Sequence, residues 1–205
     1  MNTTISISLT HFMSFLNNSS ITKINAIQKA KEDSLEPYEA YKDYWQKLKL
    51  KIVEVHKLRL GEDDLRSVVE EVSEDKQRNY NIAIDGYCKF WNKKKKAIWK
   101  KPIQGSWRKG HLNVSINPEL CLEHKDKLHL IKLFLHINEK FDRKQADMIT
   151  WLMRDSLGKK APDNMVFCVL DVKNGRLYEE RATNNNIKLY VEVEADSFCK
   201  YWNGL

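Results

Sequence analysis

The sequence predicts an α+β protein, with a helical bundle in the N-terminal half followed by a mostly antiparallel sheet with helices packed on one face. Apolar residues recur at helical spacing before residue 100 and alternate at strand spacing after Pro102. The dipeptide Asn174-Gly175, which favours a β-hairpin turn, lies between two short strand-like segments. The change of period divides the chain into an all-helical region, residues 1–100, and an α+β region, residues 101–205.

The first region is expected to form five helices, each beginning at a residue type that favours a helix N-terminus. These residues are Ser8, Ser20, Pro37, Asp63 and Ser73. The apolar stripe of the third helix, with spacings of 4, 3, 4 and 3, consists of Tyr41, Trp45, Leu48, Ile52 and Val55. Because each helix is apolar on one side only, the helices are expected to pack against each other. The helical half is also where we expect a protein partner or a second copy to bind.

The second region is expected to contain strands and two further helices. Strands are predicted at residues 112–116, 129–137, 166–170, 176–180 and 189–194. One helix begins at Asp142, where Gln145 completes a capping-box pattern. A short terminal helix, from about Asp196, is expected to bury Phe198 and Trp202. The residues of the last strand that are expected to face the core are Leu189, Val191 and Val193.

Composition and cysteine spacing indicate a globular intracellular protein. With 7 Gly and 4 Pro among 205 residues, the chain lacks long linkers and can bury a core without a disulfide or a metal. Its N-terminus does not resemble a signal peptide, and no stretch approaches the roughly 18 apolar residues of a membrane span. The four cysteines are more than 30 residues apart, which excludes a C-x-x-C pair and favours buried thiols. We therefore expect a cytoplasmic location, no membrane contact, no cofactor and no bound metal.

The basic residues gather at the junction of the two regions. The chain has a net charge of +7, and residues 89–109 contain nine Lys or Arg and no Asp or Glu. The rest of the chain has 26 basic and 28 acidic residues, a net charge of −2. Such a local patch is typical of surfaces that bind nucleic acid, because lysines neutralise phosphates and aromatic rings stack on unpaired bases. The predicted nucleic-acid-binding residues are Lys93, Lys94, Lys95, Lys96, Trp99, Lys100, Lys101, Trp107, Arg108 and Lys109.

The same segment allows two other interpretations. Lysines near a helix C-terminus are favoured by the helix dipole, so they also suit a solvated helix end whose tryptophans join the two regions. Alternatively, the basic segment binds an acidic protein partner. Exposed tryptophan rings would favour nucleic acid, whereas rings within a defined hydrophobic patch would favour a protein interface.

A metal-dependent nuclease is a further alternative. Asp163, Asp171 and Lys173 resemble the acid and acid-x-Lys pattern of PD-(D/E)XK nucleases, in which carboxylates hold Mg²⁺. Their spacing is short for two strands, and Lys173 comes directly before the predicted hairpin turn. A second version of the pattern, Glu119 with Lys132, lacks the acid two residues before the lysine. Both versions of the pattern are incomplete, so neither one predicts a catalytic residue.

Other known site patterns are absent or incomplete. The six histidines share no metal-ligand spacing, and the sequence contains no P-loop and no H-E-x-x-H motif. The helix pair at residues 8–16 and 20–32 has helix-turn-helix spacing but no clear reading face. The sequence therefore predicts a non-catalytic nucleic-acid-associated protein. The alternative is a protein-interaction accessory subunit of a larger bacterial or phage complex.

Overall fold

The computed structural model describes residues 4–35, 43–94, 96–182 and 185–205, and it confirms the α+β class. The α-helices are α1 (Leu9–Asn17), α2 (Ile21–Leu35), α3 (Gln46–Leu58), α4 (Glu62–Arg66), α5 (Glu74–Asn92), α6 (Arg143–Leu157) and α7 (Asn185–Gly204). The strands are β1 (Ile5–Ser8), β2 (Ile98–Lys100), β3 (Gly105–Lys109), β4 (Leu112–Ile116), β5 (Leu120–His124), β6 (Lys127–Phe134), β7 (Met165–Asp171) and β8 (Arg176–Glu179).

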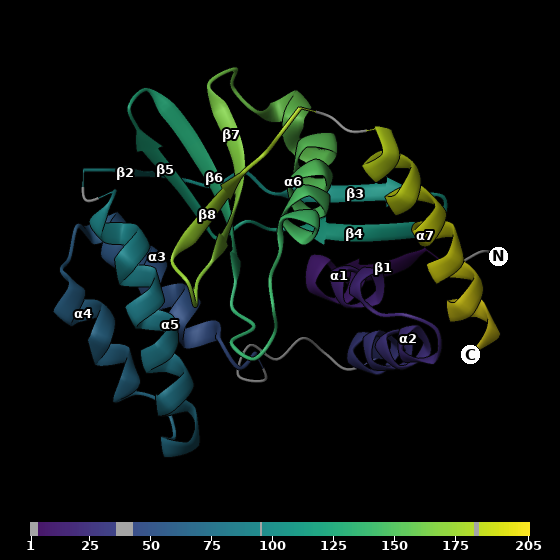
Figure 1. Cartoon of the computed structure of the whole chain (residues 1–205), viewed down its shortest axis with the longest axis horizontal. Helices are drawn as coiled ribbons and strands as arrows, with labels where there is room; N and C mark the ends of the chain where they lie inside the picture. Colours follow the sequence, from purple (N-terminus) through teal and green to yellow (C-terminus); the bar gives the residue numbers. More distant parts are fainter. Residues whose placement is uncertain (1–3, 36–42, 95, 183–184) are drawn as a thin grey trace.

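The strands form two sheets. The larger has five strands in the order β2-β5-β6-β7-β8, and only its β6–β7 pair is parallel. The smaller has three strands in the order β1-β4-β3, with β1 parallel to β4. In Figure 1 the helices α3, α4 and α5 lie on one side of the larger sheet and α6 lies on the other, toward the smaller sheet and α7.

Helices therefore cover both faces of the larger sheet, where the sequence predicted one. The cause is visible in β6, in which Leu130 and Ile131 are both fully buried although they point to opposite faces. Leu130 belongs to a hydrophobic cluster with α1, α6, α7 and the smaller sheet. Ile131 belongs to a second cluster with α3 and α5. A strand that is apolar on both faces needs a layer on each.

The two clusters do not follow the predicted boundary at residue 100. Strand β1 and helices α1 and α2, all from the first region, pack in the cluster that includes α6 and α7. Strand β1 pairs with β4 from Ile5↔Leu112 to Ser8↔Ser115, and Ile5 and Ile7 are buried. The short alternation of Ile and Ser at residues 5–8 is the strand signal that the helical interpretation missed.

Several local predictions are confirmed at the level of single hydrogen bonds. Ser8 caps α1, because its side chain accepts the backbone N–H of His11 at 3.1 Å. Asp142 and Gln145 form the expected capping box at the start of α6. In α3 the predicted apolar positions from Leu48 onward are fully buried, whereas Pro37 and Tyr41 lie outside the described residues.

The β7–β8 hairpin forms where it was predicted, but its turn is longer than two residues. Asp171 pairs with Arg176, so the loop consists of four residues between them. The Asp171 carboxylate accepts two hydrogen bonds from Asn174, one from the backbone N–H at 3.4 Å and one from the side-chain amide at 2.7 Å. These bonds favour a wider turn over a two-residue one, while Gly175 supplies the left-handed conformation with φ of 61°.

The predicted strand at residues 189–194 is wrong, because these residues belong to the long helix α7. Val191, Ala195 and Phe198 are fully buried, a spacing of four and three residues that one helix face provides. Leu189 and Val193, which a strand would have turned inward with Val191, are 63% and 53% exposed. The helical stripe prevails because it also buries Phe198 against Phe12 and Phe15 of α1.

This correction predicts different effects for two alanine substitutions. Val191→Ala should lower the free energy of unfolding by about 2 kcal/mol, because a fully buried side chain is shortened. Leu189→Ala should change it by less than about 0.5 kcal/mol, because the side chain is exposed on α7. Urea unfolding of both variants measures the difference. Equal losses would indicate that both side chains are buried, as in a strand.

Within the described part of the chain, none of the helices has the length and apolar character needed to cross a membrane.

Candidate nucleic-acid interface

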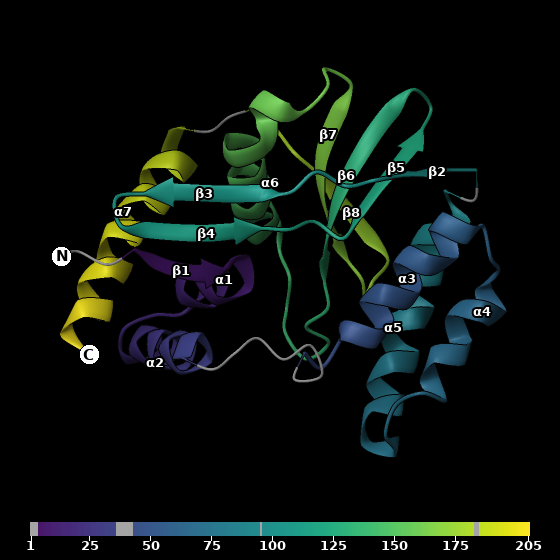
Figure 2. The same ribbon diagram turned by 180° about the vertical axis from the view of Figure 1, so that it is seen from behind.

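The end of α5 and the β7–β8 hairpin enclose a surface pocket of about 340 Å³. Both views of the ribbon show the tip of this hairpin beside α5 (Figures 1 and 2). The pocket is lined by Phe90, Lys93, Lys94, Asn174, Gly175, Arg176 and Leu177. Lys93 and Lys94 contribute cationic side chains, and none of the lining residues is acidic. Arg176 borders the pocket, but its guanidinium lies 4.8 Å from the ring centroid of Tyr178, on the other face of β8. We refer to this site as the α5–hairpin pocket.

Two glycines allow α5 and the hairpin to meet backbone to backbone. A Cβ atom on Gly86 would lie 2.0 Å from the carbonyl oxygen of Val172, and a Cβ on Gly175 would lie 2.4 Å from the carbonyl oxygen of Gly86. No side chain fits into these spaces, so both positions require glycine. The close approach brings the turn residues Asn174 and Gly175 to the same pocket as Lys93 and Lys94, whereas the Arg176 side chain lies with Tyr178 on the other face of β8.

The acidic and basic groups inside the hairpin are used to hold it together. Asp171 is buried and directs both carboxylate oxygens to Asn174. Lys173 donates from Nζ to the carbonyl oxygen of Ile137 at 2.7 Å, which ties the hairpin to the loop after β6. Asp171 therefore does not line the pocket, and the lining has no carboxylate to neutralise its cations.

The predicted lysines differ in the partners that they have. Lys100 forms an ion pair with Glu123 at 3.0 Å, and Lys109 forms one with Glu192 at 3.1 Å. Within the described residues, Lys93, Lys94, Lys96, Lys101 and Arg176 form no ion pair with a carboxylate. Lys95 lies outside those residues. Lys93 and Lys94 are thus unpaired cations at the α5–hairpin pocket, whereas Lys100 and Lys109 are already partnered.

Trp107 is buried, so its ring is not an exposed surface on which a base can stack. Its side chain is 3% exposed, and its indole Nε1 donates to Asp155 at 3.0 Å. The ring lies between Phe12, with centroids 5.8 Å apart, and Trp151, with centroids 6.0 Å apart. The alternation of β3 turns Trp107 inward while Arg108 points to solvent, where it donates to the Asn113 side chain at 3.0 Å.

Trp99 does not provide an open stacking surface either. It is half-buried on β2, and the ammonium of Lys57 lies 5.9 Å from its ring centroid. Its Nε1 is buried and finds no hydrogen-bond partner among the residues that the structure describes. Lys57 therefore already occupies the position of a cation over the ring, which a stacked base would have to displace.

The basic segment is also spread along the molecule. Strand β2 belongs to the larger sheet and β3 to the smaller one, and Figure 2 shows β3 running away from β2 toward α7. Arg108 and Lys109 therefore lie near α7 and away from α5. The predicted residues that the structure describes are therefore spread over separate parts of the molecule, and of these Lys93 and Lys94 line the α5–hairpin pocket.

The first nuclease pattern does not converge in space. Asp163 precedes β7 and Asp171 ends it, and a strand of 7 residues separates their backbones by about 20 Å. Lys173 is bound to the Ile137 carbonyl, as described above. Across the described ranges, no group of three or more His, Cys, Asp and Glu side chains is arranged to hold a metal ion.

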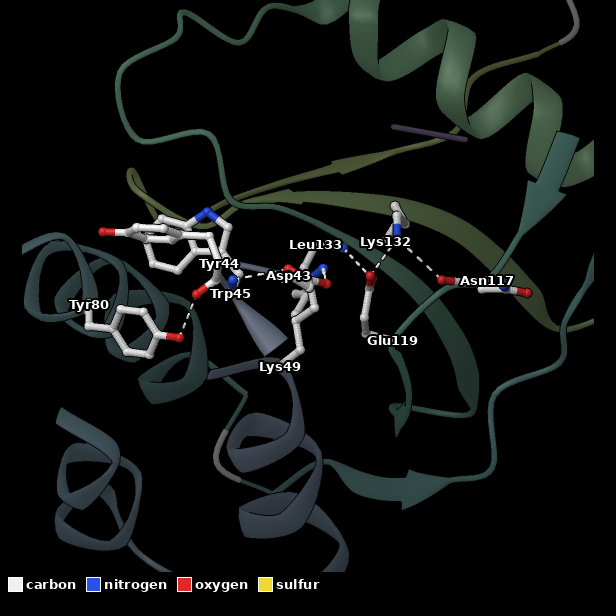
Figure 3. Close-up of polar contacts among 9 residues, drawn as sticks. All are labelled: Asp43, Tyr44, Trp45, Lys49, Tyr80, Asn117, Glu119, Lys132 and Leu133. Atoms are coloured by element: carbon white, nitrogen blue, oxygen red, sulfur yellow. Dashed lines mark hydrogen bonds and ion pairs between the residues drawn. The ribbon is translucent and has the colours of Figure 1, made fainter. Parts of the chain in front are cut away.

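The second pattern does bring its residues together, as an ion pair. Figure 3 shows Lys132 bound to Glu119 and to the carbonyl oxygen of Asn117 at 3.2 Å. Glu119 also accepts the backbone N–H of Leu133 at 2.8 Å. The side chain of Glu119 is 12% exposed and that of Lys132 is 16% exposed. Because every group in this set has a partner, the geometry supports a structural role.

The thiols and the N-terminal helix pair provide no second site. Burial raises the pKa of the Cys88 thiol to about 12 and that of Cys121 to about 11, so both are protonated at neutral pH and unreactive. In the helix pair, Lys23 of α2 binds Glu194 and Lys31 binds the carbonyl oxygen of Trp202. These lysines hold α2 against α7, so they do not form a reading face for DNA.

Leu177 is a residue of this site that the sequence interpretation missed. It lies more than 80 positions after Lys94 in the sequence, and the contact between α5 and the hairpin brings both to the pocket.

The comparisons with known proteins add little to this geometry. No protein-family model and no curated protein matches the chain. Among solved structures, the chain is similar to one from Eubacterium rectale described as "Putative exonuclease", with 10% sequence identity and a TM-score of 0.47. The similarity covers 99% of this chain and 82% of the other. A likeness of this extent carries no weight for function.

Proposed function

We propose that this protein binds nucleic acid through the sugar–phosphate backbone and does not act on it chemically. The observation that carries the proposal is the α5–hairpin pocket, which Lys93 and Lys94 line and which no carboxylate lines. Cations that no acidic neighbour neutralises are available to replace the counterions of a phosphate backbone.

The arrangement favours contact with phosphates over contact with bases. Trp107 is buried and Trp99 is covered by Lys57, so the basic surface has neither of its expected stacking rings. Without rings to stack on or a helix positioned to enter a groove, binding should depend on charge and little on sequence. Single and double strands should then bind with similar salt dependence per phosphate contact.

The proposal is tested by fluorescence anisotropy with labelled single-stranded and double-stranded DNA and RNA, at salt concentrations from about 50 to 200 mM. The test variant is Lys93→Glu with Lys94→Glu. The matched control is Lys159→Glu with Lys160→Glu, which changes the charge equally in the short helical turn before β7, away from the pocket. The test variant should bind about tenfold more weakly or worse, with a slope of log K against log salt that is smaller by about 2.

Two results would contradict the proposal. If neither wild type nor control binds any nucleic acid at low salt, the backbone-binding function is wrong. If both double variants weaken binding equally, the effect reflects total charge and not the pocket. Including Mg²⁺ in one series tests the non-catalytic part, because any cleaved product would contradict it.

The second candidate function is an accessory subunit that binds an acidic protein. The observation that favours it is Ile98 on the edge strand β2, which is 46% exposed and gives the basic surface an apolar neighbour. Absence of nucleic-acid binding together with a partner recovered by the wild type, and lost by the Lys93 and Lys94 variant, would favour this candidate. Under either function we propose a cytoplasmic location, which four free cysteines suit.

A further inference from the structure

We infer that nucleic-acid binding at the α5–hairpin pocket is linked to the uptake of a proton by His129, so that binding tightens as the pH falls. This inference rests on the proposed function and adds a regulation to the same site. Its basis is a buried imidazole that lies between Glu179, which favours the charged ring, and Lys94, which lines the pocket and opposes it.

His129 lies on β6, the central strand of the larger sheet, and faces the layer of α3 and α5. Its neighbours across the sheet are Leu122 on β5 and Val166 on β7, which both belong to the cluster under these helices. The row continues to Trp99 on β2, over which Lys57 of α3 lies. His129 is 4% exposed, and its Nδ1 atom forms no hydrogen bond within the described part of the chain. An unused nitrogen can take up a proton without breaking a hydrogen bond.

Two charged side chains act on this imidazole in opposite directions. Its Nε2 atom lies 3.6 Å from a carboxylate oxygen of Glu179, whose negative charge favours the imidazolium. Burial first, and then the charge of Lys94, lower the pKa of His129 below its usual value, and His124 on β5 acts in the same direction. On β7, burial raises the pKa of the Cys168 thiol well above its usual value, so this neighbour is uncharged. In the free protein His129 is therefore neutral at neutral pH.

Strand β8 connects the pocket with His129. Leu177 lines the pocket, and Glu179, two residues later, points to the same face of the sheet. A phosphate bound beside Lys94 brings a negative charge that offsets the charge opposing the imidazolium. The pKa of His129 is therefore higher in the complex than in the free protein.

The direction of the linkage follows from this difference. A group whose pKa is higher in the complex takes up protons on binding, so the affinity rises as the pH falls between the two pKa values. Above the higher value and below the lower one, His129 has the same charge in both forms and the affinity does not depend on its protonation. Uptake of one full proton would tighten binding by about tenfold per pH unit, and partial uptake by less.

The first test measures the pKa of His129 without nucleic acid, by NMR titration of the imidazole signals. Lys94→Gln should raise this pKa by about half a pH unit, and Glu179→Gln should lower it by about as much, because they remove charges of opposite effect. Lys200→Gln, on the exposed side of α7, is the matched control and should leave it unchanged. The same pKa in all four proteins would overturn the inference, whatever the protein binds.

The second test measures binding of a labelled DNA duplex with hydroxyl ends from about pH 5 to pH 8. This duplex has no phosphomonoester, the phosphate group that titrates near pH 6. Wild type should bind about threefold more tightly at the lower pH than at the higher, and His129→Gln should lose this change. Glu179→Gln, whose side chain is 50% exposed, should reduce the change while leaving His129 in place. The control His136→Gln removes an exposed histidine paired with Glu139 and should keep the wild-type pH dependence.

The results separate the inference from the proposed function. A wild type that binds DNA equally at every pH overturns the inference and leaves the proposed function standing. A pH dependence that persists in His129→Gln places the titrating group elsewhere and also overturns the inference. A wild type that binds no nucleic acid at any pH overturns both.

Discussion

Gly86→Ala is expected to destabilise the protein by about 3 kcal/mol or more, because the added methyl group has no space. A Cβ atom at this position would lie 2.0 Å from the carbonyl oxygen of Val172 and 2.3 Å from that of Lys173. Both obstacles are backbone atoms, which cannot rotate away as the end of a side chain can. Helix α5 would have to move off the hairpin, and the α5–hairpin pocket would open.

The control for this substitution is Gly204→Ala, at the end of α7. A Cβ atom there meets nothing within 4 Å, so alanine should have no steric cost and should gain up to about 1 kcal/mol of helix propensity. Chemical unfolding of both variants should therefore give changes of opposite sign. A Gly86→Ala variant as stable as the wild type would show that the close contact between α5 and the hairpin does not exist in solution.

The sequence predicted the elements whose signals are local. Asp142 with Gln145, and Asn174 with Gly175, act on their own neighbours through caps and turns, and these were found in place. The strand β1 was missed because four residues give little periodicity, and its partner β4 lies about 100 positions away in the chain. Pairing over such a separation is decided by tertiary contacts, which no local pattern contains.

The candidate site was predicted in part for the same reason. Charge density along the chain pointed to Lys93 and Lys94, because nearby lysines remain near each other in any fold. It also pointed to Trp107, whose burial depends on its position in β3 against α6. The hairpin side of the pocket could not be assigned, because its neighbours in the pocket come from another part of the chain. The sequence could predict where cationic and aromatic residues gather along the chain. It could not predict which side chains are exposed or which distant residues line the same pocket.

Glu119→Leu is expected to destabilise the protein by about 3–5 kcal/mol, the usual cost of removing one partner of a buried ion pair. The substitution leaves the ammonium of Lys132, whose side chain is 16% exposed, without its carboxylate. It also leaves the backbone N–H of Leu133 without its acceptor. Adding Lys132→Met to Glu119→Leu should restore much of the lost stability, because an apolar pair of similar size replaces the ionic one.

The exposed pair of Lys100 and Glu123 provides the control for this cycle. Its side chains are 49% and 35% exposed, so Glu123→Gln should cost less than about 1 kcal/mol. The same variants separate a structural role of Glu119 from a catalytic one. A structural pair predicts that the Glu119→Leu, Lys132→Met variant folds and binds nucleic acid like the wild type. Cleavage of DNA in Mg²⁺ by the wild type, lost in this stable double variant, would instead identify Glu119 and Lys132 as part of a catalytic site.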